Sequence, residues 1–130
     1  MILLNTDVCI EILRGNQSVI DKRMQIDEQV AVSFMTVGEL NYGAENSRNP
    51  DKNRRLVVEF LLSVMVINSD NKIMQQFGTI KAGLAAKKTL LADADVLIAA
   101  TALAKCSRLI TGNLKHFNKI DDLSIENWIR

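Results

Sequence analysis

Short apolar runs alternate with longer segments of helical periodicity along the whole chain. A brief apolar run bounded by polar residues predicts a buried strand, and apolar residues spaced three or four apart predict an amphipathic helix. The pattern predicts strands at residues 2–4, 30–33, 64–67, 108–111 and, as an edge strand, 124–128. It predicts helices at residues 7–14, 17–27, 36–45, 51–63, 71–87 and 92–105. Such alternation indicates an α/β fold with a mainly parallel central sheet of four to five strands flanked by helices.

Two of these segments carry more specific expectations. The helix at 92–105 has hardly any polar face, which is typical of a central, buried helix. The helix at 17–27 should place four apolar residues inward: Val19, Ile20, Met24 and Ile26. The most polar stretch, 46–53, contains the only proline, and it predicts the one long exposed loop.

The composition indicates one globular domain, residues 1–130, without a strong electrostatic preference. Sixteen Lys and Arg residues against fifteen Asp and Glu residues give a net charge of +1, so the basic surplus of a dedicated nucleic-acid-binding domain is absent. Cys9 and Cys106 lie in apolar stretches with no metal-site or disulfide spacing, and we expect both to be buried thiols. No secretory signal or membrane-spanning run is recognisable, which predicts a cytoplasmic protein with no membrane association.

Four polar stretches occupy positions that should share one edge of the sheet. Helices between parallel strands run antiparallel to them, so strand carboxyl ends and helix amino ends meet at a single edge, where ligands bind. This edge should gather four groups: Asn5, Thr6 and Asp7; Thr36 and Glu39; Asp93 and Asp95; Thr111 and Asn113. Clustered carboxylates are costly unless a cation, most often a divalent metal, lies between them.

The acidic residues also have structural explanations. Thr36 and Glu39 match a capping box, in which the glutamate bonds back to the start of its own helix. Asp93 can stabilise the helix dipole from the first turn. Asp95 fits that explanation poorly because it shares a helix face with Ile98, and the desolvation of a buried carboxylate outweighs the dipole benefit.

The remaining polar residues have similar alternatives. Asp7 can cap a helix, and Asn5 or the sequence from Thr111 to Asn113 can form ordinary turns. His116 is the only histidine and is expected to be an inert surface residue. Basic residues at ordinary solvated positions could fringe the same edge and meet phosphates there: Arg14, Lys87, Lys88, Arg108 and Lys115.

The order and spacing of these stretches resemble PIN-domain ribonucleases of the VapC toxin type. Residues 5–15 resemble the family's first motif, 32–44 the second, 95–102 the third, and 109–120 the fourth. Glu39 and Asp95 match the acidic residues of the second and third motifs. The likeness covers nearly the whole chain, and the ordered set is more specific than any single motif.

The resemblance implies a three-layer PIN-like sandwich and an endoribonuclease that depends on Mg²⁺ or Mn²⁺. Proteins of this kind commonly form homodimers, cleave transfer RNA more often than other RNA, and are neutralised by a small cognate antitoxin. The implied roles are catalysis by Glu39, Asp95, Asn5 and Asn113; metal binding by Asp95, Asn5, Glu39 and Asp7; support by Thr6, Thr111 and Asp93; and RNA binding by Arg14 and Lys115.

Asn5 departs from the family pattern, which has an aspartate at the end of the first strand. An asparagine keeps the shape of that aspartate and removes its negative charge. Asp7 could supply the missing carboxylate, the enzyme could be naturally weakened, or the residue could have been changed deliberately so that a toxic protein can be produced.

Two other classes of protein compete with the nuclease hypothesis. A catalytically inactive PIN-like module would bind RNA or a protein partner without cleaving it, and Asn5 favours this alternative. A phospho-receiver domain has the same length and sheet type, but it needs an aspartate at the end of a middle strand and a lysine after a later one. The strand expected at 64–67 is followed by Asn68, and no lysine occupies the required place.

Overall fold

A five-stranded parallel sheet runs through the centre of the molecule. The structure is a computed structural model, and it describes residues 1–130. The strands are β1 (Ile2–Leu4), β2 (Val30–Ser33), β3 (Met65–Ile67), β4 (Leu109–Ile110) and β5 (Ile125–Glu126). Their order is β3-β2-β1-β4-β5, and every neighbouring pair is parallel. The chain moves outward from β1 to β3 and then returns to the other side of β1, so the direction of winding changes between β1 and β4.

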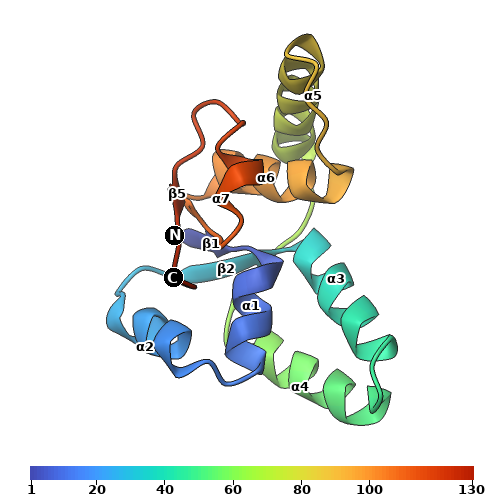
Figure 1. The fold of residues 1–130 in the computed structure, drawn as a ribbon, viewed down its shortest axis with the longest axis vertical. Coiled ribbons are helices and arrows are strands. Elements are labelled where there is room, and N and C mark those ends of the chain that lie inside the picture. Colours follow the sequence, from blue (N-terminus) through green and yellow to red (C-terminus); the bar gives the residue numbers. More distant parts are fainter.

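Helices cover both faces of this sheet, as the α/β prediction requires (Figure 1). The first four are α1 (Thr6–Leu13), α2 (Gln17–Gln25), α3 (Phe34–Glu45) and α4 (Pro50–Leu62). The last three are α5 (Asn71–Ala86), α6 (Asp93–Lys105) and α7 (Leu114–Phe117). Figure 1 shows α5, α6 and α7 on one side of the sheet and α1, α2 and α4 on the other. The three-layer arrangement is therefore confirmed.

Alternation along the short strands divides the core into two parts. Leu3 points into a cluster with α5, α6 and α7, whereas Ile2 and Leu4 point into a cluster with α1 to α4. Successive side chains of a strand face opposite sides, so three residues of β1 serve both layers. All three are completely buried.

Helix α6 is the central buried helix that its composition predicts. Six of its residues are buried: Val96, Ile98, Ala99, Ala100, Thr101 and Ala102. The one buried hydroxyl among them, on Thr101, donates to the Leu97 carbonyl oxygen at 2.8 Å and so remains paired. No helix in the structure is both long and apolar enough to cross a bilayer.

Several local expectations are wrong. Helix α3 begins at Phe34 rather than Thr36, because the Ser33 hydroxyl accepts the Met35 N–H at 3.0 Å and caps the helix. The exposed loop after α3 ends at Asn49, whose side chain caps α4, and Pro50 occupies the first turn without needing an N–H partner.

Two predicted core positions are also wrong. Met24 lies on α2 but is 78% exposed, since α2 ends at Gln25 and packs only Val19 fully inside. Cys9 is completely buried, but Cys106 ends α6 and is only half-buried. Both thiols are free, and burial raises the pKa of Cys106 to about 11.

Truncation of Ile98 to alanine should lower the free energy of unfolding by about 2–5 kcal/mol, because it opens a cavity in the middle of the core. The matched control is Leu90→Ala, at a site that is 94% exposed, which should change stability by less than about 0.5 kcal/mol. Urea denaturation followed by circular dichroism measures both. Equal effects would contradict the assignment of α6 as the core helix.

Candidate active site

The candidate site lies where the winding of the sheet changes direction, at the carboxyl ends of β1 and β4. Asn5 follows β1 and is 6% exposed, and Thr111 follows β4 and is completely buried. The Asn5 side-chain amide donates from Nδ2 to Thr111 Oγ1 at 3.0 Å. This contact joins two residues that are 106 positions apart in the sequence, so the predicted convergence of these two stretches is observed.

Asp7 fastens the loop after β4 onto α1. Its Oδ1 accepts the Val8 N–H at 2.8 Å, and its Oδ2 accepts the Gly112 N–H at 2.9 Å. The Thr111 hydroxyl lies 3.4 Å from Oδ2 as a third donor. Burial raises the pKa of the Asp7 carboxyl, while the backbone N–H donors at Gly112 and Val8 oppose that shift. Both oxygens of Asp7 are therefore engaged in holding the loop.

Glu39 is oriented by two threonines from different elements. Thr6 Oγ1, at the start of α1, lies 2.7 Å from Glu39 Oε1 and 3.0 Å from Thr36 Oγ1. A hydroxyl carries one proton, so Thr6 donates to the carboxylate and accepts from Thr36. Because α3 begins at Phe34, Glu39 lies beyond the first turn of its helix and does not form the expected capping box.

Asp95 stands at the start of α6 with a side chain that is 24% exposed. His116 Nδ1 lies 3.5 Å from Asp95 Oδ2 and 2.8 Å from Asn113 Nδ2. His116 was expected to be inert, and the structure instead places it against two predicted site residues. The spacing of three residues between Asn113 and His116, at the ends of one helical turn, is the sequence signal for this contact.

Asp93 and the basic residues lie outside these contacts. Asp93 is 62% exposed and forms an ion pair with Lys81 at 3.0 Å, consistent with its structural explanation. Arg108 precedes β4 at the opposite end of the strands, where it pairs with Glu28 and Glu126, so the expectation that it fringes the site is wrong.

Arg14 and Lys115 are exposed, and Arg14 lines a hollow between α1, α3 and α4 that also includes Glu39.

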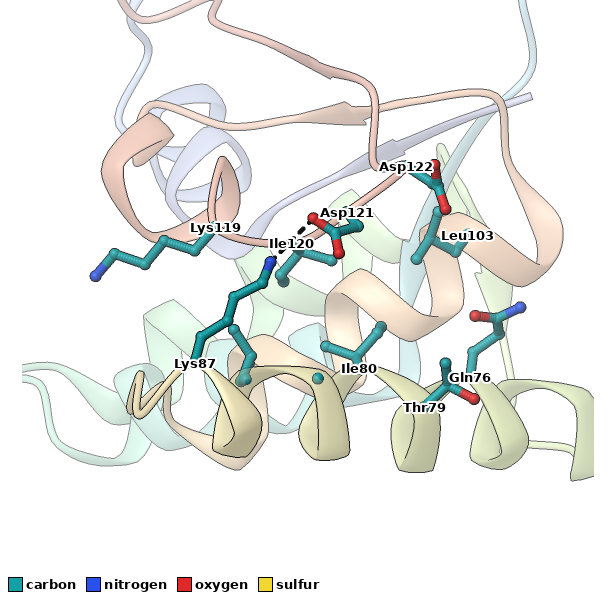
Figure 2. A pocket seen from close by; sticks show the side chains of 11 residues that line it. Gln76, Thr79, Ile80, Lys87, Leu103, Lys119, Ile120, Asp121 and Asp122 are labelled. Carbon is teal, nitrogen blue, oxygen red and sulfur yellow. Dashed lines mark hydrogen bonds and ion pairs between the residues drawn. The ribbon is translucent and has the colours of Figure 1, made fainter.

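A second hollow lies between α5 and the segment 119–122 (Figure 2). Its apolar part is formed by Ile80, Leu84, Leu103 and Ile120. Lys87 reaches across it to Asp121, with 3.0 Å between Nζ and Oδ1. Lys87 therefore forms an ion pair with Asp121, and it takes no part in the contacts that join the strand ends.

Two sets of hydrogen bonds meet at the start of α1. One connects Glu39 to Thr6, and the other connects Asn5 to Thr111, whose hydroxyl also accepts the Asn113 N–H at 3.0 Å. Asn5 and Thr6 are consecutive residues, so the two sets form one continuous group. The Asn113 side chain extends this group to His116, whose Nδ1 lies 3.5 Å from Asp95 Oδ2. Four segments far apart in the sequence are held together in this way.

The oxygen donors at this edge suit a hard divalent cation. The charged donors are the carboxylates of Glu39 and Asp95, and the neutral ones are the amide oxygens of Asn5 and Asn113. No three His, Cys, Asp or Glu side chains lie close enough together to hold a metal ion by themselves, and the residue at the end of β1, Asn5, is neutral. Mg²⁺ commonly takes one or two carboxylates and completes its shell with water and substrate phosphate, so this donor set fits it.

Gly112 leaves room for the Asp7 contact. A Cβ at this position would lie 2.7 Å from Ile129 Cδ1 and 3.2 Å from Asp7 Oδ2. Gly112→Ala should therefore lower the free energy of unfolding by about 1–3 kcal/mol through overpacking. In an Ile129→Val background, which removes Cδ1, the same substitution should cost less, as measured by a double-mutant cycle in urea. Equal costs in both backgrounds would contradict the close packing.

Comparison with known proteins supports the fold and the family. The PIN domain profile matches residues 2–123. Ribonuclease VapC2 of Haemophilus influenzae is 31% identical over 98% of this chain and 97% of its own length. The tRNA(fMet)-specific endonuclease VapC of Salmonella typhimurium is 32% identical over 97% of this chain and 96% of its own length.

Solved structures agree with the sequence matches. VapBC2 from Rickettsia felis, bound to a DNA fragment from its promoter, contains a chain that superposes with a TM-score of 0.93 at 28% identity, covering 98% of this chain and 99% of that one. DNA-bound VapBC from Salmonella typhimurium gives a TM-score of 0.92 at 30% identity, covering 98% and 97%. The chain therefore belongs to the PIN-domain family, among the VapC ribonucleases.

Proposed function

We propose that this chain is a Mg²⁺- or Mn²⁺-dependent endoribonuclease, the toxin of a toxin–antitoxin pair, which hydrolyses RNA phosphodiester bonds. The observation that carries the proposal is the continuous group of contacts from Glu39 to Asp95 across the strand ends. In it each carboxylate is contacted by a neighbouring side chain, Glu39 by Thr6 and Asp95 by His116. Family membership adds independent support.

Some residues of the site would bind the ion, and others hold these ligands in position. Asp95 and Glu39 would supply charged ligands, with Asn5 and Asn113 as neutral ones. A bound divalent ion supplies two things here: it lowers the pKa of water, and it screens charge that develops on the phosphoryl group. Thr6 holds Glu39, and Thr111 holds Asn5 and the Asn113 backbone. The exposed side chains of Arg14 and Lys115 would contact the RNA backbone.

Asn5 should make this chain a weak enzyme. Asp7 is a poor substitute ligand, because its two oxygens already accept the N–H groups of Val8 and Gly112. A metal would have to displace those donors before Asp7 could bind it. The site therefore has less negative charge than the family pattern supplies, and its affinity for a divalent cation should be low.

Asn5→Asp should restore the charge and raise Mg²⁺- or Mn²⁺-dependent cleavage by orders of magnitude. The assay is purified protein with total transfer RNA, in Mn²⁺ or EDTA, followed by gel analysis of the products. Glu39→Gln in the Asn5→Asp background is the matched control, because it keeps the shape and removes one ligand charge; it should abolish the gain. Equal activity of the parent and Asn5→Asp would show that another group supplies the missing charge.

A second variant tests the orientation of Glu39. Thr6→Val in the Asn5→Asp background removes the donor to Glu39 Oε1, and the rate should fall about tenfold or more, as expected for loss of a hydrogen bond to a charged group. Thr6→Ser keeps the hydroxyl and should retain most of the rate. Comparable losses in both variants would indicate that the methyl packing of Thr6 matters rather than its hydroxyl.

The partners follow from the names of the relatives. The relative from Salmonella typhimurium is named as specific for tRNA(fMet), so we propose transfer RNA as the substrate class. The structural neighbours are VapBC toxin–antitoxin complexes, so we propose a small antitoxin as the inhibitor. A homodimer and a cytoplasmic location complete the proposal; they rest on the family likeness and on the sequence respectively.

A catalytically inactive PIN-like module remains the second candidate, and Asn5 is the observation that favours it. Retained RNA binding with no cleavage in either metal, even by Asn5→Asp, would support that candidate. The phospho-receiver alternative is excluded, because β3 is an edge strand and the chain belongs to another family.

A further inference from the structure

We propose that His116 is a positioning residue: its Nδ1 accepts a hydrogen bond from the Asn113 side-chain amide and thereby fixes which end of that amide faces the site. The hydrogen bond involves only the imidazole and the amide. Its effect on catalysis rests on the proposed nuclease function.

The distances assign the role of Nδ1. It lies 2.8 Å from Asn113 Nδ2 and 3.5 Å from Asp95 Oδ2. Hydrogen bonds of the N–H···acceptor type fall between about 2.7 and 3.2 Å, so only the shorter contact is one. An amide nitrogen can only donate, so Nδ1 must be the acceptor. The neutral ring then carries its proton on Nε2.

The local structure of α7 gives a second reason. Asn113 is the N-cap residue of this helix, yet its side chain makes no capping hydrogen bond, although asparagine is among the preferred caps. Its backbone N–H is instead bound by Thr111 Oγ1, and its side-chain nitrogen by His116. Asn113 is therefore held at both its backbone and its side chain, and its side chain is used for something other than starting the helix.

The orientation of the amide matters because its two ends have nearly the same shape and opposite chemistry. The oxygen can contact a cation or accept from water, whereas the nitrogen repels a cation and donates. By binding Nδ2, His116 stabilises the orientation in which Oδ1 stays available. Without this acceptor, the Asn113 amide can flip and present its N–H groups where an oxygen is needed.

The histidine is suited to a direct test because it is the only one in the chain. Its ring ¹⁵N resonances are unambiguous, and the Asn113 amide protons are identified by their loss in Asn113→Asp. At a pH where the ring is neutral, we expect the tautomer with the proton on Nε2. We also expect the Asn113 amide protons to exchange with water more slowly than in His116→Ala. A proton on Nδ1, or unchanged exchange, would overturn the proposal.

Two near-isosteric variants separate positioning from direct contact with RNA. The side-chain oxygen of His116→Asn can occupy the place of Nδ1, whereas the amide of His116→Gln extends toward the place of Nε2. In the Asn5→Asp background, His116→Asn should keep kcat within a few-fold, and His116→Gln and His116→Ala should lower it by up to about tenfold, the size expected for one neutral hydrogen bond. Asn113→Ala should lower kcat less in the His116→Ala background than in a chain that keeps His116.

The outcomes distinguish the two proposals. Retained kcat in His116→Gln with loss in His116→Asn would assign the role to Nε2 and overturn positioning. Unchanged kcat with the expected tautomer would leave the hydrogen bond in place but overturn its catalytic consequence. If Asn5→Asp cleaves no RNA at all, the nuclease proposal fails, and the ring and amide resonances still decide whether His116 holds Asn113.

Discussion

The hydrogen bond between Asn5 and Thr111 connects the only two neighbouring strands between which the chain reverses its direction of winding. No crossover helix joins these two strands at such a point, which is where ligands bind in open α/β sheets. In this chain the two strand ends are joined by polar side chains that bond to one another. Asn5, Thr111 and Asp7 close the junction, Thr6 holds the Glu39 carboxylate, and the Asp95 carboxylate lies 3.5 Å from His116. The rest of the site depends on this junction.

The same junction explains why a neutral residue is tolerated at position 5. An aspartate there would stand beside Asp7, whose pKa burial already raises. Two close carboxylates without a cation repel each other, so the protein without metal is spared that repulsion by an asparagine. The Asn5 side chain also has an N–H group, which an aspartate lacks, and this group donates to the Thr111 hydroxyl. An asparagine at position 5 thus stabilises this arrangement in the protein without metal.

The sequence predicts the sheet, the central helix and the edge at which the polar stretches meet, because these follow from periodicity and from the geometry of parallel strands. It fails where two residues compete for one role. Ser33 and Thr36 can each cap α3, and the choice depends on which hydroxyl the strand end presents, so the capping box expected for Thr36 and Glu39 is not formed. His116 was missed for a related reason: its contacts come from one turn of α7 and from a helix start about twenty residues earlier. Side-chain pairings of that kind require the tertiary structure.

The complete burial of Cys9 has a practical consequence. This thiol lies on α1, the same helix that carries Thr6 and Asp7, and burial raises its pKa, so in the closed molecule neither access nor ionisation favours its reaction. A thiol-specific reagent can modify it only when α1 lifts from the sheet. The rate of that modification therefore reports how often α1, which carries Thr6 and Asp7, lifts from the sheet.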